Sequence, residues 1–363
     1  MEKQFKVFGA ALDASDLPLS IQMKHAYLNR LINNYIEKPN FLDPYDAFLE
    51  LSQVAPKKNI IKLGKFPIES WLTPKPFIDD LSRINKDEFH NFTNENHIRV
   101  YSERMADYVK KNVLPDIPLM IGVDHSLTGG VLSAISEEIG PEKLHVIILD
   151  AHFDGLPTSI AINIAKYANE HPHLINPLMP ESCFFYEDIN DTYKCGSFLK
   201  YLLDENVILA ENLIIFGCQD YPDEEIRSLD DPRIKEYIRF YDTIELSGVA
   251  FIPKEDPKRM LEKLKNILEK ISNSNIYISF DVDVAAFKDV IATRFLNLIG
   301  IDRSVLIETA DIINKNIESN SNNLIGLDLM EIEIHLLNKG FPESGRRDKT
   351  IKLLDKFLDF FIM

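Results

Sequence analysis

The sequence predicts an α/β protein built on a largely parallel β-sheet. Apolar runs of strand length recur along its 363 residues, and helical patterns follow most of them. Runs such as Val146–Leu149 do not alternate with polar residues, as expected for parallel strands that are covered on both faces. The predicted strands are Phe5–Leu12, Asn59–Leu63, Leu119–Val123, His145–Leu149, Leu213–Phe216, Ile276–Phe280 and Leu324–Met330.

One helix is clear from its periodicity. Before the strand Ile276–Phe280, apolar residues recur at helical spacing, with lysines and glutamates on the opposite face. We interpret this segment as a crossover helix that packs on the sheet, and a helix that docks a partner is the alternative. Its apolar positions are Met260, Leu261, Leu264, Ile267, Leu268 and Ile271.

The chain shows no repeat, low-complexity tract or change in composition that would mark a second domain. We therefore expect a single domain over residues 1–363. The stretch from about residue 40 to 115 contains many prolines and Trp71, and we interpret it as an elaboration of this domain. The polar run Glu318–Asn323 is expected to form a loop before the last strand.

Composition and charge limit the classes of partner. Hydrophobic residues make up 45% of the chain, enough to bury a core, and the net charge is −17. This charge repels phosphate backbones and anionic membranes but suits a small cationic substrate, so we expect no nucleic-acid or membrane partner. No apolar run is long enough for a membrane span, and Val7–Leu12 is too short for a signal peptide. The 3 cysteines, without a CxxC motif, predict a reduced, cytoplasmic protein.

Some of the predicted strands end in residues that commonly bind metal ions. These strand ends are Asp124–Ser126, Asp150–Asp154 and Asp281–Asp283. Residues two positions apart on an extended chain point to the same side, so Asp150, His152 and Asp154 can converge on one site. Because parallel sheets place ligand sites at the carboxyl ends of their strands, all of these ends are expected to lie at one edge.

A cluster of carboxylates and imidazoles at one edge requires cations, because like charges repel each other. Two divalent ions would neutralise the cluster, and ligation by oxygen with some imidazole suits Mn²⁺. Such a pair also lowers the pKa of a bridging water. A single DxD or DxH at a strand end is more often a turn or a helix cap. Several such ends in one chain favour the metal site.

The residues around these strand ends form longer motifs. Gly122–Gly130 is similar to a GGDHS motif, Asp150–Asp154 to DAHxD and Asp281–Asp283 to DxD, as found in the ureohydrolases, the arginase and agmatinase superfamily. Gly326–Glu331 is similar to the late strand of that family whose glutamate binds the substrate guanidinium, and Gly217–Asp223 weakly resembles its G-x-R-D loop. The motifs follow the order of the family.

This resemblance implies a three-layer αβα fold around an eight-stranded, mostly parallel sheet, with two Mn²⁺ ions per chain. One ion would be held by His125, Asp150, Asp154 and Asp281, and the other by Asp150, His152, Asp281 and Asp283. Asp150 and Asp281 would therefore bridge the ions. The implied reaction is hydrolysis of a guanidino-type C–N bond, with release of urea and an amine.

The candidate catalytic residues are Glu331 and Cys195. A carboxylate meets a planar guanidinium in two parallel hydrogen bonds, so the resemblance implies that Glu331 binds the cationic head of the substrate, a role that Glu333 could share. Cys195, within Lys194–Phe198, stands where the family has a histidine that shuttles protons. We expect Cys195 either to contact the substrate or the leaving amine, or to be a small packing residue.

Other departures from the family pattern concern the substrate. The loop after Asp154 lacks the Ser/Asn pattern with which arginases hold the α-groups of the amino acid, and Val284–Phe287 replaces the usual Asp-Pro. We therefore expect a guanidino or amidino compound other than free L-arginine. The alternatives are an inactive metal-binding paralogue with a regulatory role and a formimino-group hydrolase that uses the same site. A homo-oligomer is compatible with the sequence. His171 and His173 are expected in an ordinary loop rather than in a further metal site.

Overall fold

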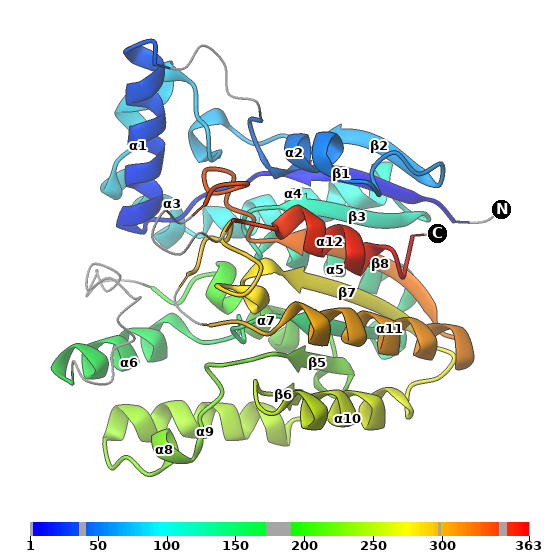
Figure 1. The fold of residues 1–363 in the computed structure, drawn as a ribbon. Coiled ribbons are helices and arrows are strands. Elements are labelled where there is room, and N and C mark those ends of the chain that lie inside the picture. The colour runs from blue at the N-terminus through cyan, green and yellow to red at the C-terminus, as the bar shows by residue number, and fades with distance from the viewer. Residues whose placement is uncertain (1–2, 36–40, 172–189, 297–298, 341–346, 363) are drawn as a thin grey trace.

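The computed structural model describes residues 3–35, 41–171, 190–296, 299–340 and 347–362. The strands are β1 (Phe5–Ala10), β2 (Ile60–Lys65), β3 (Ile117–Gly122), β4 (Leu144–Leu149), β5 (Leu213–Phe216), β6 (Ala250–Ile252), β7 (Asn275–Asp281) and β8 (Asn323–Met330). They form one 8-stranded sheet in the order β2-β1-β3-β8-β7-β4-β5-β6, and every adjacent pair is parallel. The predicted α/β fold with an eight-stranded parallel sheet is confirmed (Figure 1).

Helices cover both faces of this sheet. They are α1 (Pro18–Ile32), α2 (Pro44–Leu51), α3 (Lys86–Asn94), α4 (His97–Asn112), α5 (Leu127–Ile139), α6 (Thr158–Glu170), α7 (Phe198–Asp204), α8 (Glu224–Arg227), α9 (Pro232–Leu246), α10 (Pro257–Leu268), α11 (Arg303–Ser319) and α12 (Thr350–Leu358). In Figure 1, α11 and α12 lie in front of the sheet, and α4 and α5 lie behind it.

Successive residues of the central strands pack into different layers of the core. Ile147 and Leu149 of β4 belong to the core layer that also contains residues of α10, α11 and α12, whereas Val146 and Ile148 belong to the layer that contains residues of α4, α5 and α9. Both sides of the strand are therefore buried, which explains why its sequence shows no polar alternation.

Each strand predicted from an apolar run is present, with small shifts at its ends. The structure adds β6, which has 3 residues and is too short to produce a recognisable apolar run. The stretch 40–115 contributes β2 to the edge of the sheet and α4, which packs against α5. The organisation of the chain as a single domain stays a prediction.

The crossover helix predicted from its periodicity is α10, which connects β6 and β7. Its first turn has Pro257 at the start, and the Asp256 side chain accepts a hydrogen bond from the N–H of Arg259. Its apolar side chains, Met260 and Leu264 among them, are buried in the core. Within the described part of the chain, no helix combines the length and apolar character that a membrane span requires.

Candidate metal centre

The carboxyl ends of β3, β4 and β7 bring the predicted ligands together. His125 follows β3, Asp150 and Asp154 follow β4, and Asp281 ends β7. β8 pairs with both β3 and β7, and β4 pairs with the other side of β7, so these ends are neighbours. Ligand atoms of the four residues all lie within 4.8 Å of one another.

Nδ1 of His125 lies at the centre of this first group. It is 2.9 Å from Oδ2 of Asp154 and 3.3 Å from Oδ2 of both Asp150 and Asp281. The imidazole is fully buried. A nitrogen surrounded by carboxylate oxygens is a donor set that suits a divalent ion such as Mn²⁺.

A second group consists of Asp150, His152 and Asp283. Nδ1 of His152 lies 2.8 Å from Oδ2 of Asp283 and 3.7 Å from Oδ1 of Asp150. Asp150 therefore belongs to both groups. Asp281 belongs to the first group only, and its Oδ1 accepts a hydrogen bond from the N–H of Asp283 at 2.9 Å.

The carboxylates of the two groups repel one another. Burial raises the pKa of Asp154 to about 7, and the charge of Asp150 contributes to this rise. Burial also raises the pKa of Asp281 well above its usual range, and Asp283 and Asp150 raise it further. Oδ2 of Asp150 is buried without an aligned hydrogen-bond donor. These residues therefore fit a pair of cations, which would relieve the repulsion and fill the open acceptor.

His125 is held in one orientation by residues that the sequence pattern did not reveal. Its Nε2 lies 2.8 Å from Oγ of Ser279, and the Ser279 hydroxyl donates to Asp328 at 2.6 Å. Tyr277 and Thr128 donate to the same carboxylate. A hydrogen bond from Nε2 leaves Nδ1 free to act as a ligand. The available signal was the presence of Ser279 and Asp328 inside otherwise apolar strands.

Glu331 lies beside the first group. It directly follows β8, and its side chain is buried. Its Oε1 accepts a hydrogen bond from the N–H of His125 at 3.2 Å, whereas its Oε2 has no hydrogen-bond donor among the described residues. Both Glu331 and Asp154 have positive φ angles, 61° and 54°, which are unfavourable for residues other than glycine and are typical of functional sites.

Arg294 is a buried charge that the sequence pattern also did not reveal. It forms ion pairs with Asp13 at 3.2 Å, Glu331 at 3.6 Å and Asp124 at 3.7 Å, and Asp13 also pairs with Lys24 at 3.1 Å. We call these five residues the Arg294 network. The backbone explains the placement, because the N–H of Arg294 donates to the carbonyl of Glu331. This contact joins two distant segments and has no local signature.

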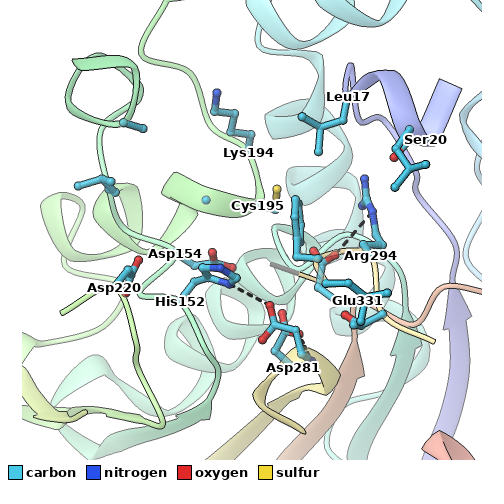
Figure 2. Close-up of a pocket in the computed structure, with 18 of the residues that line it drawn as sticks. Leu17, Ser20, His152, Asp154, Lys194, Cys195, Asp220, Asp281, Arg294 and Glu331 are labelled. Atoms are coloured by element: carbon cyan, nitrogen blue, oxygen red, sulfur yellow. Dashed lines mark hydrogen bonds and ion pairs between the residues drawn. The ribbon is translucent and has the colours of Figure 1, made fainter. Parts of the chain in front are cut away.

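Four of the six candidate ligands, His152, Asp154, Asp281 and Asp283, line a cavity of about 390 Å³. Figure 2 shows His152, Asp154 and Asp281 facing one another there, with Glu331 beside Arg294. The loop that weakly resembled a family motif contributes Asp220 to the same cavity.

Cys195 also lines this cavity, on the loop before α7. Burial raises the pKa of its thiol well above the usual range, and the charges of Asp124 and Glu331 raise it further. The thiol is therefore neutral in this environment at neutral pH, and its presence in the cavity is compatible with both expected roles.

The remaining histidines and cysteines belong to neither ligand group or lie outside the described residues. His171 directly follows α6 and stacks on Tyr167, with the ring centroids 4.2 Å apart. His173 and Cys183 lie outside the described residues. Cys218, like Cys195, is a free thiol.

Comparison with known sequences identifies the family to which this chain is similar. The sequence model of the Arginase family matches residues 49–341. The arginase of Staphylococcus aureus (strain COL) is 27% identical over 207 residues, which cover 55% of this chain. The chain spans 58% of the length of that relative.

Solved structures with the same fold include an arginase from Bacillus caldovelox, with a TM-score of 0.56 and 15% identity, covering 99% of this chain and 98% of that one. The formimidoylglutamase of Bacillus subtilis gives a TM-score of 0.52 and 17% identity, covering 99% of this chain and 86% of that one. At these identities, the similarity establishes the fold alone.

Proposed function

Because the chain belongs to the Arginase family, we propose that it is a manganese-dependent hydrolase of a guanidino-type C–N bond, releasing urea and an amine. The observation that carries this proposal is the pair of acidic and histidine groups that share Asp150. The substrate would be a small cationic guanidino compound, drawn to a protein with a net charge of −17.

We assign one ion to His125, Asp150, Asp154 and Asp281, and the other to Asp150, His152, Asp281 and Asp283. Asp281 would contribute to both ions, and in the structure its Oδ1 accepts a hydrogen bond from the N–H of Asp283. A pair of divalent ions supplies a nucleophile at neutral pH by lowering the pKa of bound water. The contact of His125 with Ser279 would keep the imidazole oriented as a ligand.

Glu331 would bind the guanidinium of the substrate. Its Oε2 is a buried acceptor without a hydrogen-bond donor, and it lines the same cavity as Asp154 and Asp281. A guanidinium N–H would satisfy this oxygen with a charge-assisted hydrogen bond. Arg294, whose Nε lies 3.6 Å from this oxygen, would keep the carboxylate in place.

The proposal is tested by incubating Mn²⁺-loaded protein with a panel of guanidino and formimino compounds and measuring urea, ammonia and formamide. Urea release from a guanidino compound is the expected result. Formamide release from a formimino compound alone would replace the proposal with the formimino alternative. A protein that binds two ions and releases no product from any compound would be the inactive paralogue.

Metal analysis of Asp281→Ala provides the control for the binuclear assignment. Removal of a bridging carboxylate should lose more than one ion per chain and all hydrolysis. Full occupancy in this variant would contradict the assignment. We further propose a reducing, cytoplasmic location, supported by the free thiols of Cys195 and Cys218.

A further inference from the structure

The cavity next to the candidate metal centre has a largely apolar outer wall. Its wall is built from segments that are distant in the sequence: the start of α1, the loop before α6, the residues after Arg294 and the chain after β8. α1 and α6 project beyond the carboxyl edge of the sheet in Figure 1. The apolar side chains of the wall include Leu17, Leu19, Met23, Leu156, Phe295 and Leu336.

The charged side chains of this cavity are poorly placed for an amino-acid head group. Arg294 is paired with three carboxylates. Asp220 already accepts hydrogen bonds from a backbone N–H and from the thiol of Cys218, and Figure 2 shows it near His152, at the level of the ligands. Lys194 makes no ion pair within the described residues, and Figure 2 shows its ammonium group directed away from the ligands. Among the described residues that line the cavity, the ammonium and the carboxylate of an amino acid would therefore find no adjacent free partners of opposite charge.

On the basis of the proposed function, we infer that the substrates are guanidines with an apolar body, an uncharged alkyl or aryl group on the guanidino nitrogen. The guanidinium would lie at Glu331 and the body against the apolar wall. Transfer of each methylene group from water to such a wall favours binding about fourfold. A terminal ammonium in the same place would lose its hydration without gaining a partner and would face the charge of Lys194.

Agmatine and pentylguanidine provide a matched test, because they differ only in a terminal ammonium against a methyl group. With Mn²⁺-loaded protein, kcat/KM for urea release should be at least tenfold higher for pentylguanidine. Across ethyl-, propyl-, butyl- and pentylguanidine it should rise about two- to fourfold per methylene. Equal or better turnover of agmatine or L-arginine, or a flat series, would overturn the inference.

Calorimetric binding of the same compounds separates this inference from the proposed function. If the affinity for the alkylguanidines rises with the length of the alkyl chain but no urea is released, the proposed hydrolase activity is refuted and the apolar substrate site is supported. Urea release without preference for the alkyl compounds would support the hydrolase and refute the apolar site.

Variants of the wall locate the effect. Leu17→Gln and Met23→Gln should each lower the ratio of kcat/KM for pentylguanidine to that for agmatine by about fivefold or more. Leu246→Gln is the control, because Leu246 is 87% exposed at the end of α9. Leu17 precedes the first residue of α1, so Leu17→Gln can disturb the start of the helix. Met23 lies within α1, and Met23→Gln then tests the placement of the substrate body by itself. An unchanged ratio in folded Met23→Gln would contradict the placement of the substrate body.

Discussion

Replacing Asp281 with asparagine should stabilise the metal-free protein and remove its stabilisation by Mn²⁺. The Asp281 side chain is 3% exposed, and ligand atoms of Asp150 and Asp154 lie within 4.8 Å of its own. Two charges at 4.8 Å repel each other by about 3.5 kcal/mol at an effective dielectric constant of about 20. Asp150 and Asp154 together repel Asp281 by about 7 kcal/mol on this basis, and attraction to a protonated His125 at 3.3 Å, about 5 kcal/mol by the same rule, offsets most of it. We therefore expect the free energy of unfolding of the metal-free variant to exceed that of the parent by about 1–3 kcal/mol at pH 8.

The gain should depend on pH in a defined direction. Burial raises the pKa of Asp281 well above its usual range. A carboxyl group with a raised folded-state pKa contributes stability below its unfolded pKa of about 3.9, and this contribution is lost as the pH rises through the folded pKa. The difference in stability between parent and variant should therefore be smaller at pH 5 than at pH 8.

The assay is urea denaturation of chelator-treated protein at pH 5 and pH 8, with and without Mn²⁺. Asp79→Asn is the matched control, because Asp79 is exposed and distant from the cavity. The reasoning is refuted by an Asp281→Asn variant that is less stable than the parent at pH 8 without metal. The reasoning is also refuted if Mn²⁺ stabilises the Asp281→Asn variant as much as it stabilises the parent.

Three further predictions concern residues around the ligands. Ser279→Ala should weaken Mn²⁺ binding about 10- to 100-fold in a calorimetric titration, because Nε2 of His125 loses its partner, and unchanged affinity would contradict this. Glu331→Gln should slow urea release while both ions remain bound, and unchanged kinetics would exclude Glu331 as the guanidinium ligand. If Cys195 contacts the substrate or the leaving amine, then Cys195→Ala, Cys195→Ser or Cys195→His should alter turnover between pH 7 and 10. Profiles identical to the parent in all three variants would restrict it to packing.

The strands and the ligand clusters could be predicted because their signals are local. Asp150 and Asp154 lie on one short segment, and an apolar run directly before them places that segment at the end of a strand. The Arg294 network has no such signal. Arg294 reaches Glu331 because the segment around residue 293 pairs with residue 332, a contact between segments that are far apart in the sequence.

Ser279 illustrates a second limit of sequence patterns. It lies in the middle of β7, where its neighbours Ile278 and Phe280 are fully buried, so the pattern indicates a core strand and nothing more. Its contact with His125 becomes visible only when β3 and β7 are placed on either side of β8. The apolar wall of the cavity is similarly non-local, because it combines α1 with segments that follow β4, β7 and β8.

The position of β8 has a consequence for how the protein is made. β8 is the last strand in the chain, yet it lies between β3 and β7 in the sheet. His125 and Asp281 therefore lie next to each other only through a strand that begins at residue 323. A growing chain on the ribosome exposes the apolar edges of β3 and β7 until this strand emerges, which is the period of greatest risk of aggregation. The group of Asp150, His152 and Asp283 depends only on β4 and β7, which pair directly, whereas the group that contains His125 is complete only when β8 has joined the sheet.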